Sequence, residues 1–478
     1  MLQIERTLEY AKRTWESIAS MTQPETGWPA DKIFWSPEDG QEGCNKNFYT
    51  DYQTSPTNIG LNFFNFLAAA RLGFVTPDFA RAKTLNALTT LEKAHKQGQT
   101  VQGFYLNWYD SRTGELLKVW PKTGRRTNQF VSTVDNGWLA AGITGVVQAY
   151  QDDQEITGLA QAILGRMDFG KLYNLYKNTP EQPWCRHPGQ LHGGARVNRK
   201  QQTMRLSRWH YGAITEARIA SYVGIARGDL PGEHYFRLYR TLPPEWKQQQ
   251  KPEGHIVTYE INDIPVEVFE GHYSYKNGGA PIEFVPPWNG GMFETMMPSM
   301  VVPEAQWGAG SWGINLRNFV LAQISHGLAS PYGVWGYSPA SNPRGYFEGK
   351  DGYGAWGVAE LGMDPRKAGK KEPPRDEVVA PHASFLALEI APREALSNLE
   401  KLREEYGLFG PYGFYDSVCP ATRKIAYSHL VLDQSMCLLP MVNYLCDGYV
   451  RNLLKAQLEP AIKPLLEKEV FSIKLAGS

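Results

Sequence analysis

Apolar side chains recur every three to four residues over much of the chain, which is the spacing of one buried face of an α-helix. The pattern predicts helices at Ile4–Ser20, Asn58–Arg71, Pro77–Lys96, Asp135–Gln151, Ile156–Met167, Gly212–Ala226, Asn315–His326, Pro381–Ile390, Pro392–Tyr406, Val431–Leu445 and Asp447–Leu466. Long loops rich in Gly, Pro and Trp separate them. We therefore expect an all-α protein whose loops build the functional site.

One segment departs from the helical spacing. His255–Glu270 reads HIVTYEINDIPVEVFE, with two alternating runs on either side of Asn262-Asp263. Alternation with period two, broken by a turn dipeptide, is typical of a β-hairpin. We expect a small hairpin inserted into the helical protein.

The charge balance and the apolar content exclude two classes of partner. Lys and Arg together number 49, as do Asp and Glu, so the chain has no basic excess to neutralise phosphates. No apolar run reaches transmembrane length. We expect neither a nucleic acid nor a membrane as partner.

The five cysteines and the first residues bear on compartment and cofactors. The cysteine count is odd, no close CxxC pair occurs, and no standard zinc spacing is present. We expect no disulfide framework, metal or cofactor.

The opening MLQIERTLEYAKRTWESIA is an amphipathic helix and not a signal peptide. This indicates a cytoplasmic protein as written, or a periplasmic or secreted one if a leader has been removed.

Glu216 is the most informative carboxylate of the chain. It falls inside the predicted helix Gly212–Ala226, and its neighbours one turn away are small or apolar: Gly212, Ala213, Ile219 and Ala220. A carboxylate in such surroundings has a raised pKa, which acid catalysis on glycosides requires. The alternative is an ordinary helix glutamate that faces water.

The segment TEARIASYVGIARGDLPGEHYFRLYR resembles the glucoamylase-like domain of bacterial cyclic β-1,2-glucan synthases and the endo-β-1,2-glucanase family. Further marks of this domain are WNGGMFETMMPSM, YGVWGYSP, VVAPHASFLALEIAPREALSNLEKL, GPYGFYDSV and HLVLDQSM. The N-terminal part resembles an uncharacterised bacterial domain family through TSPTNIGLNFFNFLAAARLGF, NWYDSRTGE and STVDNGWLAAGI. The resemblance implies one (α/α)6 toroid over residues 1–478, with an N-terminal part at 1–151 and a glucoamylase-like part at 212–466.

The same resemblance implies a glycoside hydrolase that acts on a β-glucan, with a β-1,2-linked glucan as the expected substrate, and it places Glu216 on the family's proposed acid. The synthases carry a glutamate soon after Trp-Gly-Ile-Ser, whereas the segment here is WGYSPASNP, from Trp335, without a carboxylate. This departure favours an inverting hydrolase. Two alternatives are a transglycosylase on similar glycans and a glycan-binding protein without catalysis.

An inverting hydrolase needs a second carboxylate to activate water. Asp135 begins a predicted helix, with Trp138 one turn later, and either serves as this base or caps the helix. Glu294 follows two glycines before an apolar helix start, and either takes part in catalysis or accepts hydrogen bonds from loop N–H groups.

Further residues are candidates for substrate binding. Asp351 stands before a glycine and is alternatively a turn residue. Asp416 matches an acidic position of the synthases that is usually Glu. The expected substrate-binding set is Tyr211, His210, Trp138, Trp335, Asp351, Asp416, Asp433 and Gln434. Trp108, Trp288 and Trp356 are additional sugar-stacking or core candidates.

Overall fold

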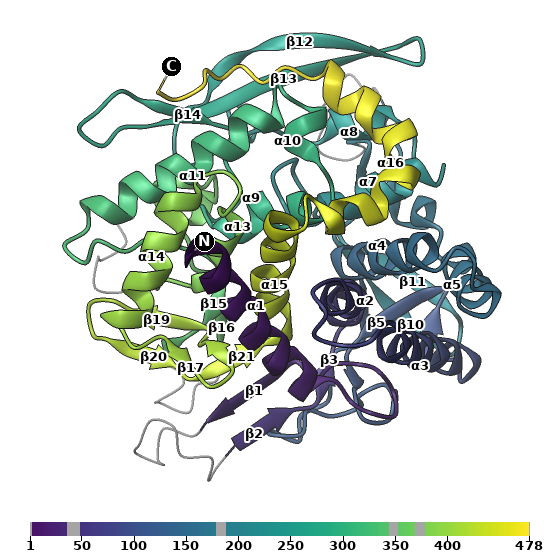
Figure 1. Ribbon diagram of the computed structural model, residues 1–478. Coiled ribbons are helices and arrows are strands. Elements are labelled where there is room, and N and C mark those ends of the chain that lie inside the picture. The colour runs from purple at the N-terminus through teal and green to yellow at the C-terminus, as the bar shows by residue number, and fades with distance from the viewer. Residues whose placement is uncertain (1, 36–47, 178–187, 344–351, 369–377, 478) are drawn as a thin grey trace.

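The computed structural model describes residues 2–35, 48–177, 188–343, 352–368 and 378–477 (Figure 1). Helices that are distant in sequence pack against one another in a closed cyclic order, and α7 joins α9 through hydrogen bonds from Arg218. We call these six helices the inner ring. In cyclic order they are α2 (Pro56–Arg71), α4 (Thr133–Ala149), α7 (Arg218–Ala226), α9 (Met292–Met296), α13 (Pro381–Leu386) and α15 (Val431–Leu445).

Six further helices cover the inner ring from outside. Each contacts a ring member: α1 (Leu2–Met21) packs on α15, α3 (Pro77–Lys96) on α2, α5 (Gln154–Arg166) on α4, α16 (Tyr449–Lys468) on α4 and α7, α11 (Trp312–Ala329) on α9, and α14 (Pro392–Glu404) on α13. Short helices α8 (Glu233–Arg237) and α10 (Glu304–Trp307) lie between them, with 3-10 turns at Phe169–Leu172, Met297–Met300, Ala359–Leu361 and Pro365–Lys367.

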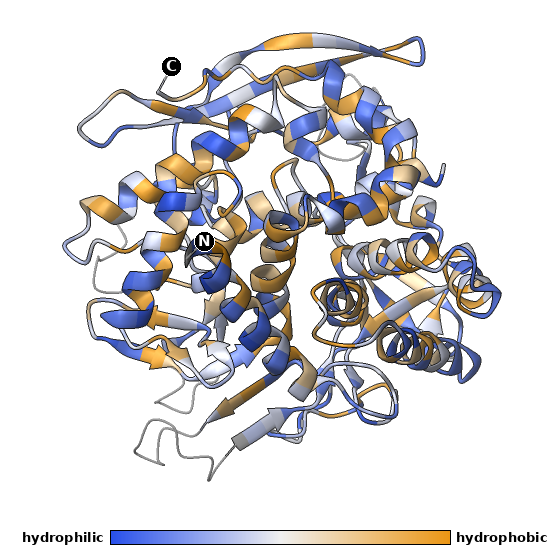
Figure 2. Cartoon of the chain, viewed as in Figure 1, coloured by the Kyte–Doolittle hydropathy of each residue, from blue (hydrophilic) through white to orange (hydrophobic). Residues whose placement is uncertain are grey.

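Burial distinguishes the two sets of helices. In α2 the residues from Pro56 to Ala69 are all buried, whereas α14 buries only one stripe, which includes Leu396, Leu399 and Leu402. Figure 2 shows the same contrast, since α15 is largely orange while blue residues alternate with orange ones along α14. The continuous core therefore lies in and around the inner ring.

Helices occupy all of the predicted ranges, but two boundaries differ in a way that matters. The prediction of Gly212–Ala226 was wrong at its start, because α7 begins at Arg218. The preceding residues bond elsewhere: Ala213 N donates to Tyr239 O (2.8 Å). Glu216 therefore lies in the turn that leads into α7 and not inside a helix. The second difference is α13, which ends four residues earlier than predicted.

The expectation of an all-α protein was also wrong, because the structure is a mixed α/β fold with several small sheets. The largest has the antiparallel order β11-β10-β7-β5-β4, from Thr203–Leu206, Gly194–Asn198, Phe130–Ser132, Phe104–Asn107 and Thr100–Val101. A second joins β2 (Phe48–Asp51), β1 (Lys32–Trp35) and β21 (Ser428–Leu430). These strands are too short for an alternating pattern to stand out in the sequence.

Five further pairs of strands fasten loops to one another. They are β3 with β6 (Gln53–Thr54, Tyr109–Asp110), β8 with β9 (Tyr173–Asn174, Gln190–Leu191), β15 with β16 (Ala340–Ser341, Tyr353–Gly354), β17 with β18 (Phe409–Gly410, Gly413–Phe414) and β19 with β20 (Ser417–Cys419, Lys424–Ala426). The loops between helices are therefore held in place by backbone hydrogen bonds.

The predicted hairpin is confirmed. Strands β12 (Glu253–Ile261) and β13 (Ile264–Tyr275) pair with Ile261 opposite Ile264, and β14 (Ile282–Phe284) extends the sheet. Asn262 and Asp263 both have positive φ, 50° and 63°. Two consecutive residues of this kind form a type I′ turn, whose twist matches that of the strands.

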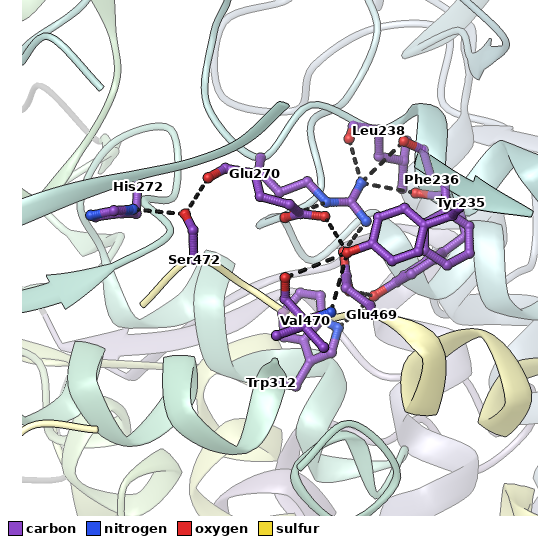
Figure 3. Close-up of polar contacts among 11 residues, drawn as sticks. Tyr235, Phe236, Leu238, Glu270, His272, Trp312, Glu469, Val470 and Ser472 are labelled. Atoms are coloured by element: carbon purple, nitrogen blue, oxygen red, sulfur yellow. Dashed lines mark hydrogen bonds and ion pairs between the residues drawn. The ribbon is translucent and has the colours of Figure 1, made fainter. Parts of the chain in front are cut away.

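A buried polar cluster fastens the C-terminal segment to this hairpin (Figure 3). The Arg240 guanidinium pairs with Glu469, at the end of α16, and lies 3.6 Å from Glu270 of β13. Tyr235 donates to Glu469, and Trp312 Nε1 donates to the Tyr235 hydroxyl at 2.7 Å. Burial raises the pKa of both carboxyl groups. One cation thus serves two buried acids, an arrangement that favours retention of a proton between them.

Candidate functional site

Candidate carboxylates stand at the N-terminal ends of inner-ring helices. Asp135 is in the first turn of α4, Glu294 in the first turn of α9 and Asp433 in the first turn of α15. Glu216 immediately precedes α7. Free backbone N–H groups at these ends favour nearby negative charge. The closed order of the ring brings Glu216 into electrostatic range of both Asp135 and Glu294, although the three residues come from distant parts of the chain.

Glu216 is half-buried, and its carboxylate accepts a hydrogen bond from Thr215 Oγ1 at 3.0 Å. Burial raises the pKa of Glu216, and the charge of Asp135 adds to the rise, while Thr215 and Arg218 oppose it. A carboxyl group with a raised pKa holds its proton to higher pH, as a general acid must. The sequence prediction of a carboxylate in apolar surroundings agrees with this setting, although the helix assumed for it does not exist at Glu216.

Asp135 lies beside Glu216 because α4 and α7 approach closely. A Cβ on Gly137 would be 2.6 Å from the Cβ of Ala220, so the missing side chain permits the contact. The Asp135 carboxylate accepts hydrogen bonds from Thr57 Oγ1 (2.8 Å) and Asn107 Nδ2 (3.2 Å). Two neutral donors orient the group without cancelling its charge, which suits a base that takes a proton from water.

Glu294 is the third carboxylate of this group. Burial raises its pKa to about 8, and the charge of Glu216 contributes to the rise. Its Oε2 accepts a hydrogen bond from the backbone N of Asn289 at 2.9 Å, which opposes the shift. The loop contact proposed from the sequence is therefore present, together with electrostatic coupling to Glu216. Two interacting acids in one site favour a single shared negative charge near neutral pH.

Arg218 joins the start of α7, next to Glu216, to α9, which carries Glu294. Its guanidinium forms a buried ion pair with Glu304 (2.6 Å) and donates to the backbone carbonyls of Glu294 (3.0 Å) and Thr295 (2.7 Å). A cation inside an otherwise apolar helix is the signal that could have revealed this role, since buried arginines are nearly always paired.

Asp416 and Asp433 form a second acidic pair. Both are buried, with 2% and 1% of their surface exposed. Asp416 Oδ2 accepts from Ser341 N at 2.6 Å, and Asp433 Oδ1 accepts from the Tyr353 hydroxyl at 3.3 Å. Burial raises the pKa of both, and Asp416 raises that of Asp433 further through its charge and a hydrogen bond. Of the two, Asp433 is therefore the carboxyl group whose protonated form is favoured more strongly.

Tyr353 connects the acidic pair with the catalytic candidates. Burial of its hydroxyl raises the pKa of Tyr353 well above its usual value. The negative charges of Asp433 and Asp416 raise this pKa further, and the charge of Glu216 makes a smaller contribution in the same direction. The residue as a whole is 43% exposed. Tyr353 did not emerge from the sequence, because its Gly-rich segment carries no periodic pattern.

Tyr211 lies within electrostatic range of Glu216 and Asp135, whereas the ring of His210 meets that of His192 at 4.7 Å between centroids. Burial raises the pKa of Tyr211, and the charges of Glu216 and Asp135 reinforce it. The pKa of His210 falls to about 4 through burial and the neighbouring His192 and His234, so its ring is neutral at pH 7. Its Nε2 lies 3.1 Å from Asn174 Nδ2.

Three other expected substrate contacts are buried instead. Trp138 is 0% and Trp335 2% exposed, which leaves no accessible ring face for a sugar. Gln434 is also buried, accepting from Ser17 Oγ (3.1 Å) and donating to Phe414 O (3.2 Å). Apolar residues on both sides enclose these rings, so they serve the core. Asp351 lies outside the described residues.

Within the described ranges, no group of three or more His, Cys, Asp or Glu side chains could hold a metal ion. In the same ranges, no helix has both the length and the apolar character needed to cross a membrane.

Comparison with known proteins confirms the resemblance. Residues 264–457 match the family model "Glycoamylase: Putative glucoamylase". The chain is 31% identical over 262 residues to cyclic β-(1,2)-glucan synthase NdvB of Rhizobium meliloti (strain 1021), a match that spans 52% of this chain. It covers only 8% of the length of that synthase. The chain is thus related to the glucoamylase-like family in its C-terminal half.

Solved structures share the fold at low identity. A putative glucoamylase from Bacteroides caccae ATCC 43185 aligns over 97% of this chain and 98% of its own, with 16% identity and a TM-score of 0.63. An endo-β-1,2-glucanase from Chitinophaga pinensis, complexed with sophorotriose and glucose, aligns over 97% and 98%, with 14% identity and a TM-score of 0.65. A mutant endo-β-1,2-glucanase from Talaromyces funiculosus, complexed with β-1,2-glucan, aligns over 100% and 94%, with 12% identity and a TM-score of 0.63.

Proposed function

We propose that this protein is a glycoside hydrolase that cleaves a β-glucan, most specifically a β-1,2-linked one, with inversion at the anomeric carbon. The observation that carries the proposal is the placement of Glu216, with its raised pKa, beside Asp135 and Glu294 at neighbouring helix ends. The β-1,2 linkage is supported by relatives whose names specify β-1,2-glucan.

In the proposed reaction Glu216 donates its proton to the glycosidic oxygen as the bond to the anomeric carbon breaks. Asp135 accepts a proton from a water molecule, whose oxygen attacks that carbon from the opposite face. The leaving sugar departs with a new hydroxyl, and the other fragment gains the water oxygen. Glu294 is the alternative base, and its coupling to Glu216 helps to keep one of the two protonated.

The residues that follow Trp335 favour an inverting mechanism. It holds no carboxylate, and its Ser338 is used structurally: Ser338 Oγ accepts from Phe293 N at 3.1 Å and lies 2.8 Å from His382 Nε2. A covalent glycosyl intermediate needs a nucleophilic carboxylate about 5–5.5 Å from the acid, whereas an inverting pair stands roughly 6.5–9.5 Å apart to admit water.

We further propose that the inner ring and its covering helices form an (α/α)6 toroid over one domain spanning residues 1–478. The support is the cyclic packing order, in which each inner helix is covered by an outer one. The small sheets are then extensions of the loops between layers. In this arrangement the substrate lies across the ring end that carries Asp135, Glu216 and Glu294.

A transglycosylase is the second candidate, and the identity to a cyclic glucan synthase favours it. Asp416 stands where the synthase motif has an acidic residue, but it is buried and bonded to Ser341, which argues for support of the site instead of attack on sugar.

Purified protein incubated with β-1,2-glucan and with β-1,3-, β-1,4- and β-1,6-glucans tests the proposal. We expect reducing ends only from β-1,2-glucan, and proton NMR of the first product should show the α-anomer. A β-anomer, or products longer than the substrate, would establish retention or transfer. Binding without release of reducing ends would leave a glycan-binding protein.

A further inference from the structure

A cavity of about 500 Å³ adjoins the carboxylate site. Ser132 lines it and also accepts the hydrogen bond from Asp135 N (3.3 Å) at the start of α4. Tyr211 lines it as well, and the charges of Glu216 and Asp135 act on the Tyr211 hydroxyl. A glycan that reaches Glu216 can therefore extend directly into this cavity.

The charge of the cavity lining is one-sided. Arg196, Arg205 and Arg208 line it, and neither Asp nor Glu is among its lining residues. All three arginines are exposed, and none has a hydrogen bond or ion pair within the part of the chain that the structure describes. Elsewhere arginines such as Arg81 and Arg166 pair with carboxylates. The three cavity arginines are thus available to a ligand.

Two of these arginines oppose each other in the sheet. Arg196 of β10 and Arg205 of β11 are direct partners across the antiparallel register, so their side chains lie on the same face. Like charges directly opposite each other destabilise a strand pair. An anion bound between the two guanidinium groups would relieve this repulsion and use donors that lack a partner in the described part of the chain.

The cavity also offers a surface for a sugar ring. Trp209 lines it, is 55% exposed, and meets Tyr211 edge-on at 5.0 Å between ring centroids. Gly193 lies against the indole, since a Cβ there would be 2.0 Å from the ring. The indole is therefore held from behind while much of it stays open, as a stacking platform requires.

We propose that this cavity is a subsite for a glycan unit that carries a negatively charged substituent, a carboxylate or phosphate ester. The sugar ring stacks on Trp209, and the anion is bound by the guanidinium groups of Arg196, Arg205 and Arg208, whose planar donors match both oxyanions. This inference rests on the proposed function, which it deepens: the preferred substrate is a substituted and not a neutral β-glucan.

The test compares three forms of one β-1,2-gluco-oligosaccharide: unmodified, succinylated, and acetylated to the same degree. The acetyl ester controls for bulk without charge. We expect the succinylated chain to have a KM lower than that of the acetylated chain by on the order of tenfold. This ratio should shrink with added salt, because partly exposed ion pairs are screened. A phosphorylated chain identifies which oxyanion is preferred.

The arginines are tested by the combined variant Arg196→Gln, Arg205→Gln, Arg208→Gln, in which the ratio of the two KM values should fall to about one. The matched control is Arg317→Gln, which removes the same charge from an exposed position on α11, outside the cavity, and should keep the ratio. Circular dichroism and the unfolding midpoint verify that the combined variant is folded.

The outcomes separate this inference from the proposed function. Equal KM values for succinylated and acetylated chains in the wild type, or a ratio unaffected by the three substitutions, overturn the charged subsite while hydrolysis stands. If no form is hydrolysed, the proposed function fails, and calorimetry decides the subsite. The subsite is supported if the succinylated chain binds more tightly than the acetylated chain and loses this advantage in the combined arginine variant. Equal binding of the two chains, or no binding of either, overturns the subsite.

Discussion

Arg218 donates a hydrogen bond to the backbone carbonyl of Glu294, with 3.0 Å between Nη1 and the oxygen. The same guanidinium is held by Glu304, which also accepts from the Tyr222 hydroxyl at 2.7 Å. The start of α7, next to Glu216, is thereby tied to α9, which carries Glu294. Two candidate carboxylates from distant parts of the chain are kept in register by a residue that need not touch substrate.

Replacing Arg218 by Met should lower the free energy of unfolding by about 3–5 kcal/mol, because it leaves Glu304 buried without its partner. Urea denaturation measures the loss, and Arg218→Lys should recover part of it by restoring the charge. Arg317→Met, at an exposed position, should change stability by no more than about 0.5 kcal/mol. Unchanged stability in Arg218→Met would show that this cluster does not join the two helices.

Glu216→Gln should reduce hydrolysis of β-1,2-glucan by on the order of a hundredfold or more while leaving binding nearly intact. The amide keeps the shape but has no acid proton to donate. The rate under saturating substrate and calorimetric binding of the oligosaccharide measure the two effects. Glu260→Gln, at an exposed position on β12, makes the same side-chain replacement away from the site and should be fully active. Near-normal turnover of Glu216→Gln would move the acid role to Glu294.

The raised pKa of Glu294 predicts a specific pH dependence of stability. Its folded pKa is about 8, against a reference value of 4.5, so between these values the folded protein holds a proton that the unfolded chain has lost. The free energy of unfolding therefore falls as pH rises through this window. Glu294→Gln removes this contribution.

The measurement is the unfolding free energy at pH 5 and pH 8 for the wild type and Glu294→Gln. The wild type should lose more stability between the two pH values than the variant does. The variant also loses the hydrogen bond from Asn289, but this loss affects its stability at both pH values and so cancels to first order in the difference between them. Equal pH dependence of the two proteins would mean that Glu294 is not perturbed by burial and by Glu216.

Asp433→Asn should cost no more than about 1 kcal/mol of unfolding free energy at neutral pH. The raised pKa favours the protonated form of Asp433, and an amide replaces a neutral carboxyl group with little change in shape. As pH rises above the reference value of 3.8, the variant should gain stability relative to the wild type, because only the folded wild type holds a proton that its unfolded chain releases. A large loss of stability at pH 7 would show that Asp433 is the charged member of the pair.

Gly142→Ala should destabilise the protein by about 1–3 kcal/mol or more through overpacking. A Cβ at Gly142 in α4 would be 2.1 Å from the Gly60 carbonyl oxygen in α2, where backbone must move. Gly158→Ala, in α5 and without neighbours within 4 Å, should instead gain about 0.5–1 kcal/mol from lower unfolded-chain entropy. Thermal unfolding compares the two, and a tolerated Gly142→Ala would contradict the close approach of α2 and α4.

Local features of the sequence determined the helices and the hairpin. The three-to-four-residue spacing of apolar positions placed α3 (Pro77–Lys96) and α15 (Val431–Leu445) at their observed bounds, and Asn262-Asp263 placed the turn between β12 and β13. These signals depend on neighbouring residues alone, so they are readable without the fold. The motif around Glu216 likewise singled out a carboxyl group whose pKa burial raises.

Only the tertiary structure decided which residues meet. Glu216 lies outside α7 because the segment before the helix bonds elsewhere, through Ala213 N to Tyr239 O. Trp138 and Trp335 are core residues because the fold buries both. The roles of Arg218 and Tyr353 depend on partners that are far away in sequence. The role proposed for the cavity arginines depends on which side chains the fold places around them. Burial and charge coupling arise from the sum of contacts around the ring, and no local pattern of a single segment contains that sum.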